Sequence, residues 1–186
     1  GVPVTILNDA KAAALAEASW GSLAGCASGI VIVLGTGIGG ALILDGKVLA
    51  GKHFAAGEFS TICMDAHHDD LFHTWCSLNG SSKLITTAAY ARGVDPAAVT
   101  GEDVFRWVNE GDEAVCMALD SFTLTLAGMI RNLQLIFDPE RIAIGGGISQ
   151  QPKLMESLHK NLDQVERMAA RHGMPRADVV TCKYYN

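Results

Sequence analysis

Residues 29–49 read GIVIVLGTGIGGALILDGKVL, and this stretch decides the fold. The apolar, β-branched run 30–34 predicts one strand, and the apolar run 41–44 predicts a second. The glycine-rich residues 35–40 between them predict a tight turn, and Asp45-Gly46 after the second run is a typical hairpin signal. The stretch therefore predicts a β-hairpin with a turn of nearly bare backbone, followed by a return strand over 47–50.

Two interpretations of the glycine turn stay open. Glycine lets a ligand come close and lets several backbone N–H groups point at one spot, which suits a phosphate. A tight turn whose glycines adopt positive φ angles needs the same residues without any ligand. A third interpretation fails. Residues 35–40 match the dinucleotide fingerprint G-x-G-x-x-G, but that fingerprint requires a helix after the glycines, and here a strand follows.

The composition is that of an ordinary globular chain of 186 residues, of which 49% are hydrophobic and 18% charged. A net charge of −6 argues against a general nucleic-acid-binding surface, and no Lys/Arg cluster indicates one. The five cysteines are irregularly spaced, which is typical of a reducing compartment, so we expect a cytoplasmic protein. No apolar run approaches the roughly 20 residues of a membrane span, so we expect no membrane partner.

Outside the hairpin, the sequence predicts an α/β domain with a mixed sheet. We expect strands over 2–7, 141–144 and 177–182, and helices over 10–20, 82–92, 101–109, 112–137 and 151–172, the last as one helix or two. This order predicts a hairpin at one edge of the sheet and parallel strands joined by helical crossovers. The helix 112–137 has a wide apolar face, which suits either a dimer interface or a buried core helix. The chain opens on a strand already under way and stops without a closing element, so we expect a piece of a longer protein.

Three further segments carry residues on which a site could be built. Asn8-Asp9 stands where a strand gives way to a helix, and a carboxylate there can take a proton from a substrate hydroxyl; Asp9 can equally be only the helix N-cap. Glu58, after the small residues 55–57, can accept hydrogen bonds from sugar hydroxyls or lie in a solvated loop. The run Gly145-Gly146-Gly147 can support a flat nucleoside or serve a close helix–sheet contact.

Taken together, these segments resemble the ROK family of sugar kinases and sugar-responsive repressors. The matching strings occur in the family's order: NDA at 8–10, AALAE at 13–17, GTGIGG at 35–40, AGE at 56–58 and IGGGIS at 144–149. The resemblance implies an actin-like ATPase fold of the ribonuclease H-like, sugar-kinase type. It implies that residues 1–186 form most of a single C-terminal lobe, without the final helix and without the N-terminal lobe that carries the family's first phosphate motif.

The resemblance also implies roles for individual residues. Asp9 would be the base that deprotonates a sugar hydroxyl. The implied contacts come from two sets of residues: Asn8, Gly57 and Glu58 for the sugar, and Gly35, Thr36, Gly37, Gly39, Gly145, Gly146 and Gly147 for ATP. The turn up to Gly40 would hold the phosphates, the triple glycine would lie beside the adenosine, and Mg²⁺ would bridge the phosphates.

The chain departs from the family between residues 59 and 82. Many members have a histidine three residues after the Glu of the AGE motif, and then a Cys-x-Cys-Gly-x-x-Gly-Cys-x-Glu run that binds zinc and contacts the sugar. Here Thr61 takes the histidine position and no Cys-x-Cys follows. His68, His73 and Cys76 can be imagined as ligands, but their spacing fits no structural zinc pattern, so we expect no metal site and no structural zinc. Residues 79–82 are expected in place of the cysteine turn, and the identity of the sugar stays open.

The leading hypothesis is a ROK-type kinase that phosphorylates a hexose, an amino sugar or a glucoside with ATP and Mg²⁺. The alternative is the sugar-sensing lobe of a ROK transcriptional repressor, which would bind nucleic acid only through an N-terminal helix-turn-helix. A pure binding or dimerisation module is a third class. We expect a homodimer, and we expect this piece alone to be inactive because half of the ATP cleft is missing.

Overall fold

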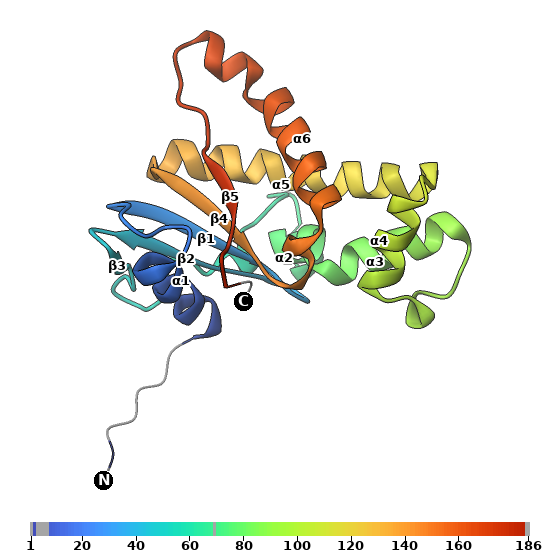
Figure 1. Ribbon diagram of the computed structural model, residues 1–186, viewed down its shortest axis with the longest axis horizontal. Coiled ribbons are helices and arrows are strands. Elements are labelled where there is room, and N and C mark those ends of the chain that lie inside the picture. The colour runs from blue at the N-terminus through green and yellow to red at the C-terminus, as the bar shows by residue number, and fades with distance from the viewer. Residues whose placement is uncertain (1, 3–7, 69, 185–186) are drawn as a thin grey trace.

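The computed structural model describes residues 2, 8–68 and 70–184 (Figure 1). The expected strand over 2–7 therefore lies outside the described residues, apart from Val2. The main elements follow one another in this order: α1 Asp9–Trp20, β1 Ser28–Leu34, β2 Ile38–Leu44, β3 Lys47–Val48, α2 Trp75–Asn79, α3 Ser81–Arg92, α4 Gly101–Asn109, α5 Glu113–Phe137, β4 Arg141–Gly145, α6 Pro152–Arg171 and β5 Val179–Thr181.

Within the described part of the chain, five strands form one mixed sheet in the order β3-β2-β1-β4-β5. β2 pairs antiparallel with both β1 and β3, whereas β4 pairs parallel with both β1 and β5. The hairpin thus forms one edge of the sheet and the parallel strands form the other. The α/β fold with a mixed sheet is confirmed, and 151–172 forms the single helix α6.

Helices cover both faces of this sheet (Figure 1). Successive side chains of a strand point to opposite faces, and β1 follows this rule. Ile30 and Ile32 join the larger hydrophobic core with α5 and α6, whereas Val31 joins a smaller core with Ala14 of α1. The sheet is therefore the middle of three layers, and α1 covers one of its faces.

α5 is the central helix of the larger core. Its buried side chains recur every three or four residues, among them Leu119, Phe122, Leu126 and Ile130, so its wide apolar face belongs to a core helix. Among the described residues, α5 is also the one helix long and apolar enough to cross a membrane, but half of its most apolar window is buried inside the protein. A core helix meets that criterion equally well. The expected lack of a membrane partner therefore stays a prediction.

The hairpin turn is shorter than the sequence predicted. Leu34 pairs with Ile38, so only residues 35–37 form the loop, and Gly39 and Gly40 lie inside β2. None of the four glycines in 35–40 has a positive φ angle, so that requirement does not explain them. Positive φ angles occur in the next turn, where Asp45 (φ 52°) and Gly46 (φ 69°) form the two-residue connection between β2 and β3.

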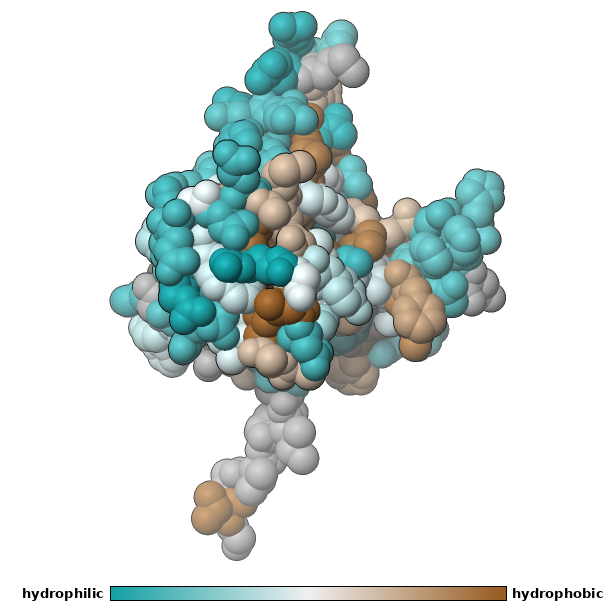
Figure 2. Space-filling model, turned by 90° about the vertical axis from the view of Figure 1, so that its right-hand side faces the viewer, coloured by the Kyte–Doolittle hydropathy of each residue, from teal (hydrophilic) through white to brown (hydrophobic). Residues whose placement is uncertain are grey.

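The face at the right of Figure 1 is mostly hydrophilic, and its apolar side chains form small areas among polar ones (Figure 2). The projecting end of the molecule at the top of this view is also hydrophilic. This view therefore shows no extended apolar surface of the kind that marks a large protein interface.

Candidate active site

The glycine turn 35–37 is held in place by the start of α3. The Ser81 N–H donates to Gly35 O at 2.8 Å, and the Ser82 hydroxyl donates to Thr36 O at 3.1 Å. Within the turn, the Gly35 N–H donates to Gly37 O at 3.0 Å. The turn is thus fixed both internally and by a neighbouring helix, and the exposed residue Thr36 lies at its tip.

The glycines of this stretch differ in what excludes a side chain. A Cβ on Gly40 would stand 2.1 Å from the Phe59 ring, and a Cβ on Gly39 would stand 3.0 Å from the Cβ of Ala10 on α1. Packing therefore explains both. A Cβ on Gly35 would meet nothing closer than 3.8 Å, and its φ angle is not positive. The protein itself gives no reason for glycine at position 35.

In the triple glycine 145–147, too, packing explains glycine at one position and not at another. Gly146 has a φ angle of 91°, and a Cβ there would stand 2.3 Å from Leu34 O, so a close contact with β1 explains it. The buried Ser149 hydroxyl donates to Gly146 O at 2.8 Å and fixes this turn. Gly145 is buried at the end of β4, whereas Gly147 is exposed and has open space where a Cβ would stand. Of the three, only Gly147 is open to a ligand.

The two glycine turns lie side by side. β1 and β4 are parallel neighbours, so their carboxyl ends reach the same edge of the sheet. The contact between Gly146 and Leu34 brings the second turn directly onto the residue before Gly35. In open α/β sheets, ligands bind at the carboxyl ends of the parallel strands. The open backbone at Gly35 and Gly147 is therefore where a ligand is expected.

Asn8 and Asp9 stand at the start of α1. Asn8 is the N-cap, because its Oδ1 accepts the Lys11 N–H at 3.2 Å, so the interpretation of Asp9 as the N-cap was wrong. Asp9 is the first residue of the helix, and its Oδ1 accepts the N–H of Ala10 at 2.8 Å. The Asp9 carboxylate is exposed at the helix N-terminus, whose partial positive charge favours an anion.

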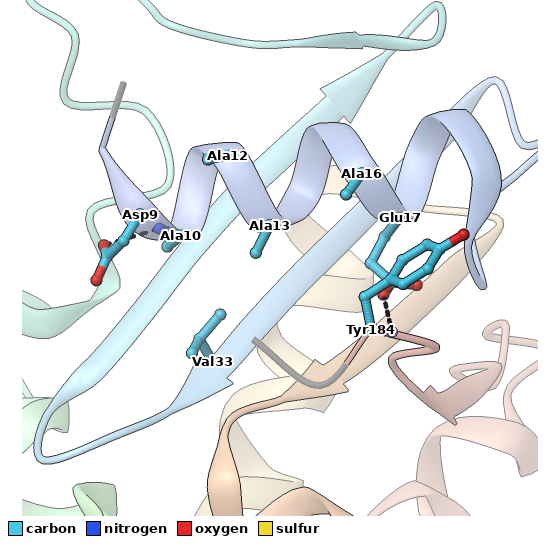
Figure 3. Close-up of a pocket in the computed structure, with 8 residues that line it drawn as sticks. All are labelled: Asp9, Ala10, Ala12, Ala13, Ala16, Glu17, Val33 and Tyr184. Carbon is cyan, nitrogen blue, oxygen red and sulfur yellow. Dashed lines mark hydrogen bonds between the residues drawn. The ribbon is translucent and has the colours of Figure 1, made fainter. Parts of the chain in front are cut away.

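Asp9 lies at one end of a pocket of about 400 Å³ that runs along α1 (Figure 3). Alanines of α1 line the pocket together with Val33 of β1 and Tyr184. Glu17, at the other end, is buried and accepts three backbone N–H groups from the loop after α1 and from the chain after β5. Of the two carboxylates, Asp9 is therefore the one available to a ligand.

Glu58 lies against the start of α1. The Lys11 ammonium stands between them, with Nζ 3.0 Å from Glu58 Oε1 and 2.6 Å from Phe54 O. Gly57 has a φ angle of 80°, and a Cβ there would stand 2.8 Å from the Cα of Ala41 on β2, so backbone packing explains this glycine. The Glu58 side chain is 44% exposed and can accept further hydrogen bonds.

The predicted site residues thus form two groups, each against the β1–β2 hairpin. Asn8 and Asp9 stand at the start of α1, which packs on β2, and Glu58 is held to the same end of this helix by Lys11. The glycines predicted to hold ATP stand at the carboxyl ends of β1 and β4, except Gly39, which lies inside β2. β1 and β2 are the two arms of one hairpin, so the groups are neighbours. The arrangement can place a hydroxyl beside a carboxylate and phosphates beside bare backbone.

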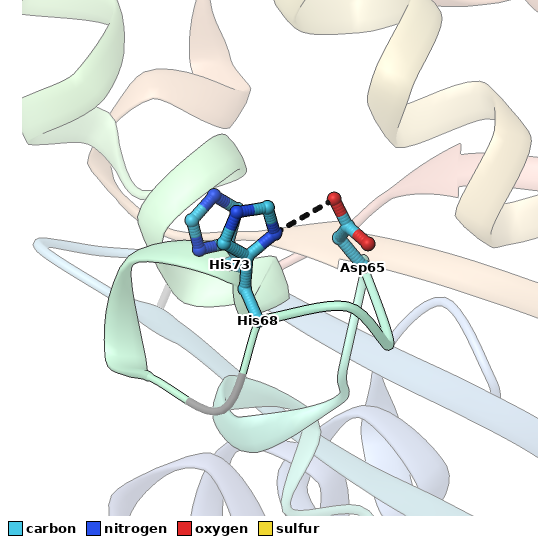
Figure 4. A group of neighbouring side chains, drawn as sticks. All are labelled: Asp65, His68 and His73. Atoms are coloured by element: carbon cyan, nitrogen blue, oxygen red, sulfur yellow. Dashed lines mark hydrogen bonds and ion pairs between the residues drawn. The ribbon is translucent and has the colours of Figure 1, made fainter.

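The segment without the family's zinc run holds a histidine pair. The rings of His68 and His73 stack with centroids 3.8 Å apart and planes 16° apart, and His68 Nδ1 lies 3.0 Å from Asp65 Oδ2 (Figure 4). One ligand atom from each of these three residues lies within 4.8 Å of the others. Cys76 is not in this group, because its Sγ faces the glycine turn, 2.9 Å from where a Cβ on Gly37 would stand.

This group does not fit a structural zinc site. Such a site needs four ligands arranged as a tetrahedron, and the described residues bring three together. The lone pairs of an imidazole lie in its ring plane, so those of two nearly parallel rings run side by side and do not converge on one ion. The expected absence of a structural zinc stays a prediction.

One residue of the site and the role of one predicted segment were missed from the sequence. One is Lys11, whose partner Glu58 is distant in the chain. The other is the segment 79–82, in which a Cβ on Gly80 would stand 2.3 Å from Thr36 O, while the buried Asn79 side chain bonds both Trp75 Nε1 and Phe122 O. This segment supports the glycine turn. Asn-Gly before a serine-rich helix start indicates a turn, but only the fold shows what lies opposite.

Residues 1–184 match the sequence profile of the ROK family. The β-glucoside kinase of Klebsiella pneumoniae is 32% identical over 164 residues, which cover 87% of this chain and 55% of the kinase. The N-acetyl-D-glucosamine kinase of Aliivibrio fischeri is 35% identical over 176 residues, which cover 87% of this chain and 57% of the kinase. The chain spans about half the length of the curated relatives it matches.

Solved structures are similar over nearly the whole chain. A ROK family protein from Streptococcus pneumoniae in complex with sucrose has a TM-score of 0.87 at 26% identity, over 98% of this chain and 61% of that one. A ROK family glucokinase from Streptomyces griseus in complex with glucose and AMPPNP has a TM-score of 0.82 at 23% identity, over 98% of this chain and 64% of that one. A ROK family transcriptional regulator, a homolog of the E. coli MLC protein, has a TM-score of 0.78 at 23% identity, over 99% of this chain and 49% of that one. The last two are evidence for the fold alone, and the expected actin-like, sugar-kinase fold is confirmed.

Proposed function

The chain belongs to the ROK family, and we propose that it is the C-terminal lobe of an ATP-dependent sugar kinase. The names of two curated relatives, a β-glucoside kinase and an N-acetyl-D-glucosamine kinase, support this reaction class. The glucokinase of the same fold was solved with glucose and AMPPNP, which supports ATP as the phosphoryl donor. Because the chain spans about half the length of its relatives, the proposal concerns the full-length protein.

The observation that carries the proposal is the meeting of two glycine turns beside a free carboxylate. Gly35 and Gly147 are glycines that neither packing nor φ angle explains, and both stand at the carboxyl ends of parallel strands. Asp9 lines the adjacent pocket together with Val33 of β1 and is not the cap of its helix. Bare backbone for phosphates and a base for a hydroxyl are the parts that phosphoryl transfer to a sugar requires.

The residues divide the work of the reaction among them. When bound, ATP would supply the phosphoryl group, and Mg²⁺ would neutralise the negative charge of the phosphates. Asp9 accepts the proton of the attacking sugar hydroxyl, whose oxygen then forms the new bond to phosphorus as ADP leaves. The Asn8 Oδ1 is engaged as the helix cap, so its Nδ2 group is what remains to donate to the sugar. Glu58 accepts hydrogen bonds from other sugar hydroxyls.

Substitution of Asp9 in the full-length protein tests this mechanism. With ATP, Mg²⁺ and a panel of D-glucose, N-acetyl-D-glucosamine, N-acetyl-D-galactosamine and cellobiose, we expect at least one sugar to support release of ADP. Asp9→Asn should lower kcat by about 10²–10⁴-fold, because the proton acceptor is lost. Sugar binding without ATP, measured by calorimetry, should stay within a few-fold of wild type because the amide keeps the size of the side chain.

Asp45→Asn is the matched control, since this exposed residue stands in the β2–β3 turn, where asparagine adopts the same positive φ angle easily. It should have wild-type kinetics. An Asp9→Asn enzyme with wild-type kcat would contradict the assignment of the base. A wild-type protein that binds a sugar of the panel but phosphorylates none would contradict the kinase proposal.

A sugar-sensing repressor is the second candidate, because the ROK transcriptional regulator shares the fold. The two candidates differ in the sequence upstream of Gly1. A helix-turn-helix there would indicate a repressor, and a phosphate motif without one would indicate a kinase. Binding of full-length protein to DNA upstream of its own gene, released by sugar, would support the repressor.

A homodimer in the cytoplasm completes the proposal. All five cysteines are free, which suits a reducing compartment. α5 leaves a few apolar side chains exposed beside its buried face: Met117, Leu124, Leu135 and Ile136. Size-exclusion chromatography with light scattering measures the oligomeric state of the full-length protein directly. A monomer at micromolar concentration would contradict this part of the proposal.

A further inference from the structure

The position of Lys11 is unfavourable for a lysine, both for its charge and for its burial. It is the third residue of α1, so its positive charge lies at the positive end of the helix dipole. Its side chain is also buried, with 8% of the residue exposed, and burial of an ammonium is costly without partners. A residue that conflicts with both rules is retained for a tertiary contact or for function.

The partners of Lys11 both belong to the loop between β3 and the 3-10 turn Phe59–Thr61. Nζ donates to Phe54 O at 2.6 Å and to Glu58 Oε1 at 3.0 Å. Phe54 has a φ angle of 58°, which is rare for a bulky residue, so this loop conformation depends on contacts that hold it. Lys11 thus fixes both ends of the short segment that carries Glu58.

The Lys11 contact leaves Glu58 half engaged. Oε1 bonds to Lys11, whereas no described residue donates to Oε2, and the side chain remains 44% exposed. A carboxylate held by one oxygen presents the other in a defined direction. A sugar hydroxyl would therefore meet a single fixed acceptor at Glu58 and not a freely rotating carboxylate.

We propose that Lys11 is a positioning residue of the sugar site, which orients Glu58 so that Oε2 accepts a hydrogen bond from a sugar hydroxyl. This inference rests on the proposed kinase function. Lys11 would act on sugar binding through Glu58, and it would have no direct part in proton transfer by Asp9 or in binding of ATP.

A double-mutant cycle in the full-length protein tests the inference. Lys11→Met keeps the length of the buried stem without the charge, and Glu58→Ala removes the acceptor. For the best substrate of the sugar panel, each single substitution should raise the sugar KM about tenfold, the effect of losing one charge-assisted hydrogen bond. The KM for ATP and kcat should change less than about twofold. In the Glu58→Ala background, Lys11→Met should have almost no further effect on the sugar KM, because its target is gone.

Lys160→Met is the matched control. Lys160 also forms an ion pair, with Asp120 at 2.9 Å, but it is exposed on α6 and should leave all constants unchanged. If Lys11→Met raised the sugar KM by the same factor in the wild-type and the Glu58→Ala background, the inference would be overturned, since a merely structural lysine acts independently of the carboxylate. An unchanged sugar KM in Lys11→Met would overturn it as well and leave the kinase proposal intact. If wild type neither binds nor phosphorylates any sugar, the proposed function itself fails, and the inference with it.

Discussion

Gly146 and Gly147 are adjacent residues for which we predict opposite effects of alanine. Gly146→Ala would put a Cβ at a φ angle of 91° and 2.3 Å from Leu34 O. The backbone strain alone should lower the free energy of unfolding by about 1–3 kcal/mol. Gly147→Ala meets open space, so stability should stay within about 0.5 kcal/mol, while the KM for ATP of the full-length protein should rise. Urea unfolding and ATP titration measure the two effects.

The pair separates a structural from a functional glycine in one turn. A Gly147→Ala protein with an unchanged KM for ATP would contradict the placement of the nucleoside at this turn. A Gly146→Ala protein as stable as wild type would contradict the contact between this turn and β1.

Sequence reasoning at the residue scale succeeded where the cause is local. The start of α1 is predicted to within one residue, but Asn and Asp are equally good caps, so propensity alone does not decide which one caps. Lys11 was missed because its partner Glu58 is 47 residues away. Its meaning depends on how the loop after β3 returns to α1, which no local pattern encodes.

At the element scale, a carboxylate near the C-terminal end of α1 attaches this helix to the rest of the fold. Glu17 is 1% exposed and accepts the backbone N–H groups of Ser22, Lys183 and Tyr184 at 2.7, 3.1 and 2.8 Å. Its charge also reaches Cys182, whose pKa rises to about 12, mainly through burial and secondly through Glu17. Glu17 therefore ties α1 to the chain after β5.

We predict that Glu17→Ala lowers the free energy of unfolding by about 3 kcal/mol, because partly buried N–H groups lose their acceptor. Urea unfolding followed by circular dichroism measures this change. Glu156→Ala is the control, since this exposed residue pairs with Lys153 on one turn of α6, and its effect should stay within about 0.5 kcal/mol. Equal effects of the two substitutions would contradict the structural role of Glu17.

Three aspartates on different elements make stability depend on acid pH. The pKa of Asp103 is lowered first by the Thr100 side chain in the capping box of α4, that of Asp120 by Lys160, and that of Asp70 by His73. Their folded pKa values lie below the ordinary 3.8, so each stabilises the fold above about pH 4 and loses this effect as the pH falls further. Thermal unfolding from pH 6 to pH 3 should show the loss, and Asp103→Asn should flatten part of it. An identical slope in Asp103→Asn would contradict the contribution of this carboxylate.

At the element scale, periodicity predicted most of the fold. β1 was found as a continuous apolar, β-branched run, because its side chains are buried on both faces of the sheet. α5 was found from its three-and-four spacing, because this helix is buried along one face. The prediction of a six-residue turn over 35–40 was wrong because every glycine was taken as a sign of a turn. Gly39 and Gly40 are glycines of a strand, made necessary by α1 and Phe59 packing onto β2. The segment 51–80 has no periodicity, and it contacts the hairpin through Gly57, Ser60 and Gly80.

At the scale of the whole molecule, the proposed ligand contacts gather around the β1–β2 hairpin, because α1 and the loop that carries Glu58 pack on β2 and the turn after β4 packs on β1. In the proposed kinase, Gly35 and Gly147 would supply backbone and Asp9 a base, and the resemblance to the ROK family implies that the first phosphate motif lies in the N-terminal lobe. We therefore predict that the 186-residue chain by itself releases no ADP above background from ATP, Mg²⁺ and the sugar that the full-length protein phosphorylates. A coupled ADP assay at equal molar concentrations measures this, with circular dichroism to verify that the chain is folded. Turnover by the folded chain alone would contradict the two-lobe proposal, because one lobe would then hold a complete site.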